Sequence, residues 1–197
     1  MALQTKTITA NGSNGHHKFS MTVTEDSTNV AKNQSTVYYT LKLEPIQSGW
    51  DWSRTNAMWY TIKIGASTVA DGYLSNYSGS GTVTLYSGTI YIGHNSDGNK
   101  STTFSFEIGS MNYSYLPGTA SASGSMTLTP IARKATLTSA PDFTDEQSPT
   151  ITYSNPAGTA AEKLQACISW TGAADIAYRD ISKTGTSYTF NFTDAEK

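Results

Sequence analysis

The sequence predicts an all-β protein: an antiparallel β-sandwich over residues 1–130 and a second, incomplete β-rich unit over residues 131–197. Apolar residues alternate with polar ones along most of the first 130 residues, as in strands with one buried face. Turn-forming dipeptides separate these runs at short intervals. No segment before residue 130 has the 3.6-residue apolar period of an amphipathic helix.

The alternating runs predict seven or eight strands, each with its apolar members turned to the core. In chain order these members are Phe19, Met21 and Val23; Val37, Tyr39, Leu41 and Leu43; Met58, Tyr60, Ile62 and Ile64; Val83 and Leu85; Ile90 and Ile92; Phe104, Phe106 and Ile108; and Ala120, Ala122, Met126 and Leu128. Turns are expected at Asn11-Gly12, Asn14-Gly15, Asp71-Gly72, Gly79-Ser80-Gly81, Asp97-Gly98 and Pro117-Gly118. Strands of this number and spacing are typical of an immunoglobulin-like sandwich.

A junction is expected at residues 130–141, where two prolines flank Arg133-Lys134, the longest basic run of the chain. The segment beyond it again predicts strands, at residues 150–153, 164–170, 176–181 and 188–192. Thr193 or Asp194 would cap a helix that has no room to continue. We therefore expect the second unit to be part of a longer one.

Composition excludes several function classes. Charged residues make up 14% of the chain and the net charge is −2, so the concentrated positive charge of a nucleic-acid-binding protein is missing. No stretch approaches the roughly 20 apolar residues of a membrane-spanning helix, so no membrane insertion is expected. Cys167 is the single cysteine, which rules out an intrachain disulfide, and its apolar neighbours predict a buried structural thiol.

No catalytic or metal motif stands out in the sequence. A nucleophile elbow, a metalloprotease helix motif and paired cysteines are all missing, so we expect neither an enzyme nor a cofactor nor a metal. His16, His17 and His94 are expected to be solvent-exposed turn residues. The oxygens of Asn95, Asp97 and Asn99 resemble part of a calcium loop, but the distal acidic ligand is missing, and a tight turn is the preferred interpretation.

Aromatic residues beside turn signals are the candidate ligand-binding residues, because aromatic rings on loops stack on sugar rings or anchor protein interfaces. If the segment around Trp50 and Trp52 is extended, both indoles project from one face and form a platform, and a nearby carboxylate accepts sugar hydroxyls. The competing interpretation is that the indoles fill the core. The candidates are Trp50, Asp51, Trp52, Tyr73, Tyr77, Tyr113 and Tyr115.

Three passages carry a family resemblance: residues 21–25 through 49–52, residues 94–100 before the phenylalanine-rich strand, and residues 179–190. Together they resemble the siphovirus tail structural proteins of phages and prophages of gut Firmicutes, a group of minor tail, tail-fibre and antireceptor-like proteins. The resemblance implies a non-enzymatic tail protein with structural or adhesive function. Its expected partners are other tail proteins, further copies of itself in a homo-oligomer, and host cell-wall polysaccharide.

The compartment signals fit a virion protein of the phage tail. The N-terminus lacks the charged and apolar regions of a signal peptide, while the surface chemistry is that of an extracellular β protein. A protein made in the host cytoplasm and released by lysis combines the two, although a cytoplasmic β protein fits as well. Two rival functions stay open: a carbohydrate-binding module of another extracellular protein, and a glycan-degrading tail enzyme with two close carboxylates in a cleft.

Overall fold

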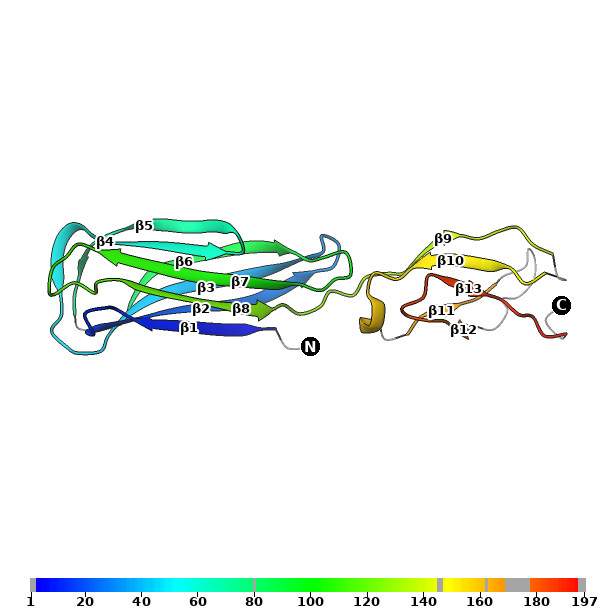
Figure 1. Cartoon of the computed structure of the whole chain (residues 1–197), viewed down its shortest axis with the longest axis horizontal. Helices are drawn as coiled ribbons and strands as arrows, with labels where there is room; N and C mark the ends of the chain where they lie inside the picture. The colour runs from blue at the N-terminus through cyan, green and yellow to red at the C-terminus, as the bar shows by residue number, and fades with distance from the viewer. Residues whose placement is uncertain (1–2, 80, 145–146, 162, 169–177, 195–197) are drawn as a thin grey trace. The chain divides into compact units, whose positions relative to one another are not determined.

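The computed structural model describes residues 3–79, 81–144, 147–161, 163–168 and 178–194. The chain divides into two compact units. The first contains residues 1–93 and 100–129, and the second contains residues 94–99 and 130–197 (Figure 1). The main division therefore falls between Thr129 and Pro130.

Two four-stranded antiparallel sheets form the first unit. One sheet has the order β1-β2-β3-β6, with strands Thr5–Asn11, His17–Asn29, Gln34–Pro45 and Val83–Gly93. The other has the order β5-β4-β7-β8, with strands Ser67–Tyr77, Trp52–Ile64, Ser101–Ser110 and Ala120–Thr127. The predicted all-β, antiparallel fold is confirmed. Its immunoglobulin-like detail is not, because in the immunoglobulin constant-type order the fourth and fifth strands complete the first sheet.

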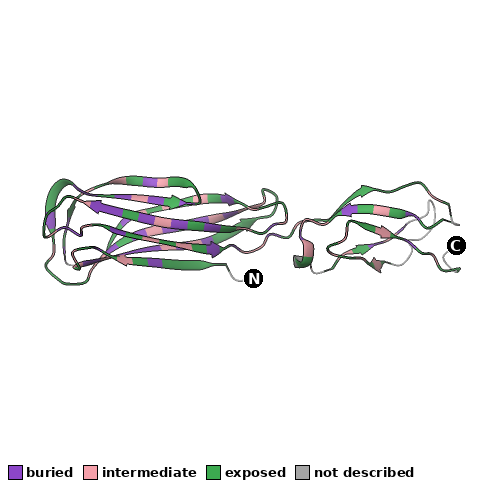
Figure 2. Cartoon of the chain, viewed as in Figure 1, coloured by how far each residue is buried: buried purple, intermediate pink, exposed green. Residues whose placement is uncertain are grey.

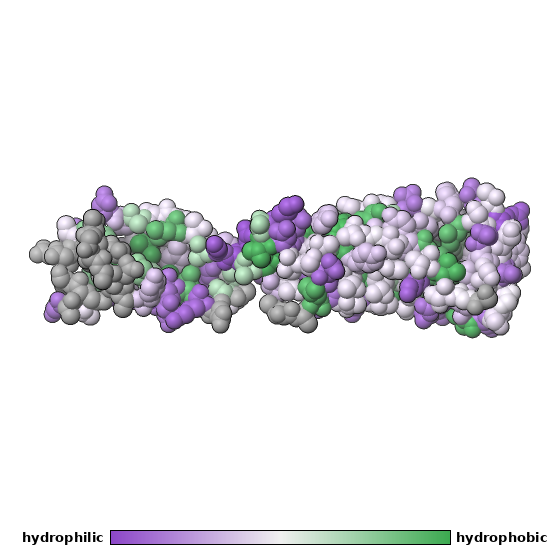
Figure 3. All heavy atoms as spheres, turned by 180° about the vertical axis from the view of Figure 1, so that it is seen from behind, coloured by the Kyte–Doolittle hydropathy of each residue, from purple (hydrophilic) through white to green (hydrophobic). Residues whose placement is uncertain are grey.

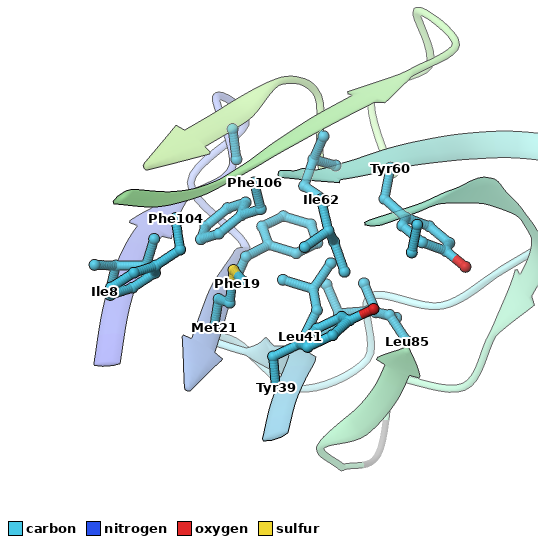
Figure 4. Close-up of a cluster of buried hydrophobic side chains, with 14 of the residues drawn as sticks. Ile8, Phe19, Met21, Tyr39, Leu41, Tyr60, Ile62, Leu85, Phe104 and Phe106 are labelled. Atoms are coloured by element: carbon cyan, nitrogen blue, oxygen red, sulfur yellow. The ribbon is translucent and has the colours of Figure 1, made fainter. Parts of the chain in front are cut away.

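The core lies between these two sheets and contains the predicted alternating residues. Phe19, Leu41 and Ile62 are fully buried, and Phe104 and Phe106 are 1% exposed. Figure 4 shows these side chains from both sheets pointing toward one another. Along most of β3 and β7, buried residues accordingly alternate with more exposed ones (Figure 2), which is the period of a sheet with one solvated face.

The structure differs from the sequence prediction at three strands. The predicted turn at Asp71-Gly72 lies inside β5, where Gly72 pairs with Tyr60 and the tyrosine ring covers the glycine. The two short strands expected around residues 83–85 and 90–92 are one strand, β6, and β1 was not predicted.

β6 contains a bulge, because its register against β3 shifts between Leu41 and Lys42 and leaves Leu85 as an extra residue. The extra residue lets Leu85 and Tyr86 both turn to the core, as a two-against-one bulge does. Val83, which was expected to be buried, is 38% exposed at the end of the strand.

The second unit is smaller and contains short strands. A three-stranded sheet has the order β13-β10-β9, with strands Ser187–Thr189, Thr150–Ser154 and Thr136–Ser139. β11 (Gln165–Ala166) pairs with β12 (Arg179–Asp180), and a 3-10 turn, η1, spans Gly158–Ala160. β9 falls inside the segment that the sequence predicts as a junction.

Ala166, Ile168 and Phe190 form a buried apolar cluster in the described part of this unit. Predicted strand residues 169–170 and 176–177 lie outside the described residues, as do residues 195–197 of the predicted helix start. Within the part of the chain that the structure describes, no helix has the length and apolar character needed to cross a membrane.

Candidate functional site

A pocket at one end of the sandwich brings four of the predicted site residues together. Asp51, Trp52, Tyr77 and Tyr115 line it, with Ser53, Asn76 and Ser78, around a volume of about 450 Å³. These residues come from the start of β4, the end of β5 and the loop that leads to β8. The pocket therefore has aromatic walls with one carboxylate and several hydroxyl and amide groups at its rim.

Trp50 and Trp52 do not form the exposed platform that alternation predicts. Trp52 is 4% exposed and belongs to the core, packed against Tyr77 with ring centroids 4.7 Å apart. Trp50 is half-buried in the loop before β4 and stacks on His16 at 3.4 Å between ring centroids. Burial of the large apolar area of an indole stabilises the fold. For Trp52 the structure therefore has the core-filling arrangement, the competing interpretation of the sequence.

His17 is fully buried at the start of β2, contrary to the expectation of an exposed turn histidine. Its ring contacts Trp52 and Tyr77 edge-on, at centroid distances of 5.6 and 5.4 Å. Nε2 donates a hydrogen bond to the Trp50 carbonyl oxygen, 3.1 Å away. Burial lowers the pKa of His17, and this outweighs the hydrogen bond to Trp50, which raises the pKa. Burial therefore favours the neutral form of the imidazole over the charged one.

Two buried polar atoms of this ring cluster have no hydrogen-bond partner among the described residues. They are Nδ1 of His17 and Nε1 of Trp52. Because Nε2 of His17 donates to a carbonyl, Nδ1 is an acceptor, while the indole Nε1 is a donor. Unsatisfied buried polar atoms are rare in folded proteins. Here one belongs to Trp52, which lines the pocket, and the other to His17, which packs against Trp52 and Tyr77.

Besides Trp50, two other predicted site residues lie outside the pocket lining. Tyr113 stacks on Tyr115, with ring centroids 5.8 Å apart, and the Arg54 guanidinium lies 4.1 Å above the Tyr113 ring. These contacts extend the cluster of rings at the pocket end of the sandwich, which we call the aromatic end. Tyr73 lies elsewhere, in the middle of β5, where it is 65% exposed and pairs with Trp59 of β4.

Two outward-facing residues were not among the predicted site residues: Trp59, which is 41% exposed, and Glu107 of the neighbouring strand β7. A signal for both was present. Met58 and Tyr60 were assigned to the core, so the residue between them had to point outward, and the same holds for Glu107 between Phe106 and Ile108.

The candidate calcium loop is a tight turn. Asp97 accepts hydrogen bonds from the backbone N–H and the side-chain amide of Asn99, at 2.9 and 3.1 Å, and Gly98 has a φ of 81°. The hydrogen bonds from Asn99 lower the pKa of Asp97. Within the described residues, no three His, Cys, Asp or Glu side chains come together as a metal site requires.

Residues 8–192 match the model of a family described as siphovirus protein of unknown function (DUF859). The chain belongs to this siphovirus family. The match covers both units, confirms the siphovirus resemblance and indicates a phage structural protein. The family description names no position in the virion. Searches of curated proteins and of solved structures find no significant match to the chain.

Proposed function

We propose that this siphovirus protein is a non-enzymatic structural component of the phage tail that contacts carbohydrate on the host cell surface. The observation that carries the proposal is the end pocket. It combines the partly exposed ring of Tyr115 with Asp51, two serines and an asparagine, the groups that stack on sugar rings and hydrogen-bond their hydroxyls. As a tail component, the chain also contacts other tail proteins, including further copies of itself.

Binding is better supported than catalysis at this pocket. Glycoside hydrolysis uses two carboxyl groups on opposite sides of the scissile bond, roughly 5–10 Å apart. The pocket lining contains one carboxylate, that of Asp51. A single carboxylate with hydroxyl and amide neighbours serves as an acceptor for sugar hydroxyls.

The test uses the full chain and cell walls purified from a panel of Gram-positive gut bacteria. Tyr115→Ala and Asp51→Asn should weaken binding about tenfold, the effect of losing one good ring or hydrogen-bond contact. Tyr38→Ala is the matched control, since Tyr38 is a half-exposed tyrosine on the other sheet. Periodate oxidation of the walls, which cleaves sugar diols, should abolish binding. Undiminished binding to oxidised walls, or no binding to any wall, would overturn the proposal.

A further inference from the structure

The outer face of the β5-β4-β7-β8 sheet contains a second set of aromatic and polar side chains, fixed in rows by the strand register. Tyr73, Trp59 and Gly109 lie opposite one another on β5, β4 and β7. The next outward row consists of Asp71, Thr61, Glu107 and Ser121, and the one after it of Lys63, Ser105 and Ser123. An aromatic row thus borders two rows of hydrogen-bonding groups.

Gly109 holds the Trp59 indole flat on the sheet. A Cβ atom at residue 109 would overlap the indole atoms Cε2, Cζ2 and Nε1, so one side of the ring lies directly against the glycine. The side chain still has 41% of its surface exposed. A ring fixed in this way loses little conformational freedom when a ligand stacks on it.

Covering a strand glycine does not by itself explain an exposed tryptophan. Tyr60 covers Gly72 and Tyr39 covers Gly88 in the same way, but these two rings are 8% and 3% exposed and belong to the core. Trp59 has the same relation to its glycine on the solvent side of the sheet. Its free surface is therefore available to a ligand.

Two shallow depressions lie next to each other on this face. One, of about 390 Å³, is lined by Thr61, Lys63 and Glu107 together with serines of β7 and β8. The other, of about 380 Å³, includes Trp59, Gly109 and Glu107. Because both are lined by Glu107 and Ser121, they adjoin across the strands, and we refer to the two depressions together as the groove.

We propose that this groove binds an internal stretch of a linear glycan with little or no net charge. Trp59, with Tyr73 beside it, would stack on a sugar ring, while Glu107, Thr61 and the serines of β7 and β8 would hydrogen-bond hydroxyls. The inference rests on the carbohydrate binding proposed above, and it adds a second binding site, for the internal sugar units of a glycan.

The charges of the face favour this ligand over other polymers. Lys63 is the one cation in the three rows, and it lies beside the carboxylates of Asp71 and Glu107. A polyanion would need several cations here. The rows are rich in hydroxyl groups and poor in aliphatic side chains, whereas the centre of a protein interface is typically depleted in serine and charged residues.

The experiment uses the full chain on an array of bacterial surface polysaccharides, followed by calorimetric titration of those that bind. Trp59→Ala should raise the Kd about tenfold or more. Gly109→Ala keeps the tryptophan but displaces its ring, and should raise the Kd similarly. Glu107→Gln, which does not disturb the packing, should raise the Kd severalfold. Tyr91→Ala is the matched control, because Tyr91 is 66% exposed on a strand of the other sheet. Circular dichroism verifies that each variant is folded.

The outcomes separate this inference from the proposed function. If no polysaccharide binds the unmodified chain, both fail. If glycan binding is weakened by Tyr115→Ala but unchanged in Glu107→Gln and in folded Trp59→Ala, the groove is not a glycan site and the inference alone is overturned. If Trp59→Ala leaves glycan binding intact and changes the mass measured by light scattering, the groove is a protein interface, which also overturns it.

Discussion

Replacing Glu25 with glutamine should destabilise the sandwich far more than replacing an exposed glutamate. Glu25 of β2 is 1% exposed, and its carboxylate accepts hydrogen bonds from Ser35 Oγ at 2.7 Å and Thr129 Oγ1 at 2.6 Å. The backbone N–H groups of Thr129 and Gln4 also donate to it, at 3.0 and 3.4 Å. The carboxylate thereby joins β2 to the start of β3, to the N-terminal segment and to the last residue of the sandwich.

The magnitude follows from these contacts. Glu25→Gln removes the charge and turns an NH₂ group toward buried donors, so at least one donor loses its partner. We expect the free energy of unfolding to fall by about 2–4 kcal/mol. Glu44→Gln is the control, since Glu44 forms a partly exposed ion pair with Lys18 at 2.9 Å, and it should cost at most about 1 kcal/mol. Urea denaturation, followed on the transition of the sandwich, measures both variants.

The pH dependence of the stability of wild type and of Glu25→Gln provides a second measurement. Burial raises the pKa of Glu25, but the hydrogen bonds from Thr129, Ser35 and Gln4 outweigh it, so the pKa is lowered from 4.5. The stabilisation is therefore complete above pH 4.5 and is lost as the pH falls through the lowered value. The stability difference between wild type and Glu25→Gln should shrink over this range. A constant difference from about pH 6 to about pH 3, or equal effects of Glu25→Gln and Glu44→Gln, would refute the reasoning.

Three further predictions concern the aromatic end and the turns. Trp52→Ala should lower the free energy of unfolding by about 3–5 kcal/mol, and Trp50→Ala by less than about 1 kcal/mol, because only Trp52 belongs to the core. Similar losses for the two variants in thermal unfolding would contradict this difference in burial. Because burial lowers the pKa of His17 from 6.5, wild-type stability should fall as the pH drops below 6.5, and His17→Gln should lack this slope in urea titrations. Gly12→Ala places a Cβ against a backbone carbonyl of the loop before β8 and should lower the melting temperature, whereas Gly93→Ala, with open space around it, should not.

The alternating pattern was sufficient to predict the sheets because it reports burial directly. Phe19, Met21 and Val23 of one strand, and Met58, Tyr60, Ile62 and Ile64 of another, could be assigned to the core from the sequence. A period of two has one solution once one face is buried. β5 was not predicted, because only Ala70 and Tyr77 of its eleven residues are buried. An edge strand with so few buried positions has little apolar alternation to detect.

The candidate site was predicted less well, because its residues meet through the fold. Asp51, Tyr77 and Tyr115 come from three separate loops or strand ends, and sequence spacing does not show that they share a pocket. The burial of His17 was missed because two adjacent histidines in a glycine-flanked segment resemble a solvated turn. The strand begins at His17, so that its side chain turns into the core while His16 stays outside.

Three aromatic–glycine pairs recur in the sandwich, two with the ring in the core and one with the ring exposed. Tyr39 with Gly88, Tyr60 with Gly72 and Trp59 with Gly109 are each directly opposed across neighbouring strands. In each pair the ring occupies the space that a side chain on the glycine would need, a device that stabilises glycine inside a sheet. Tyr60 and Trp59 are adjacent in the chain and therefore face opposite sides of the sheet. One ring fills the core and the other is exposed to solvent, so a one-residue slip of β4 would turn Trp59 into the core and Tyr60 to the solvent.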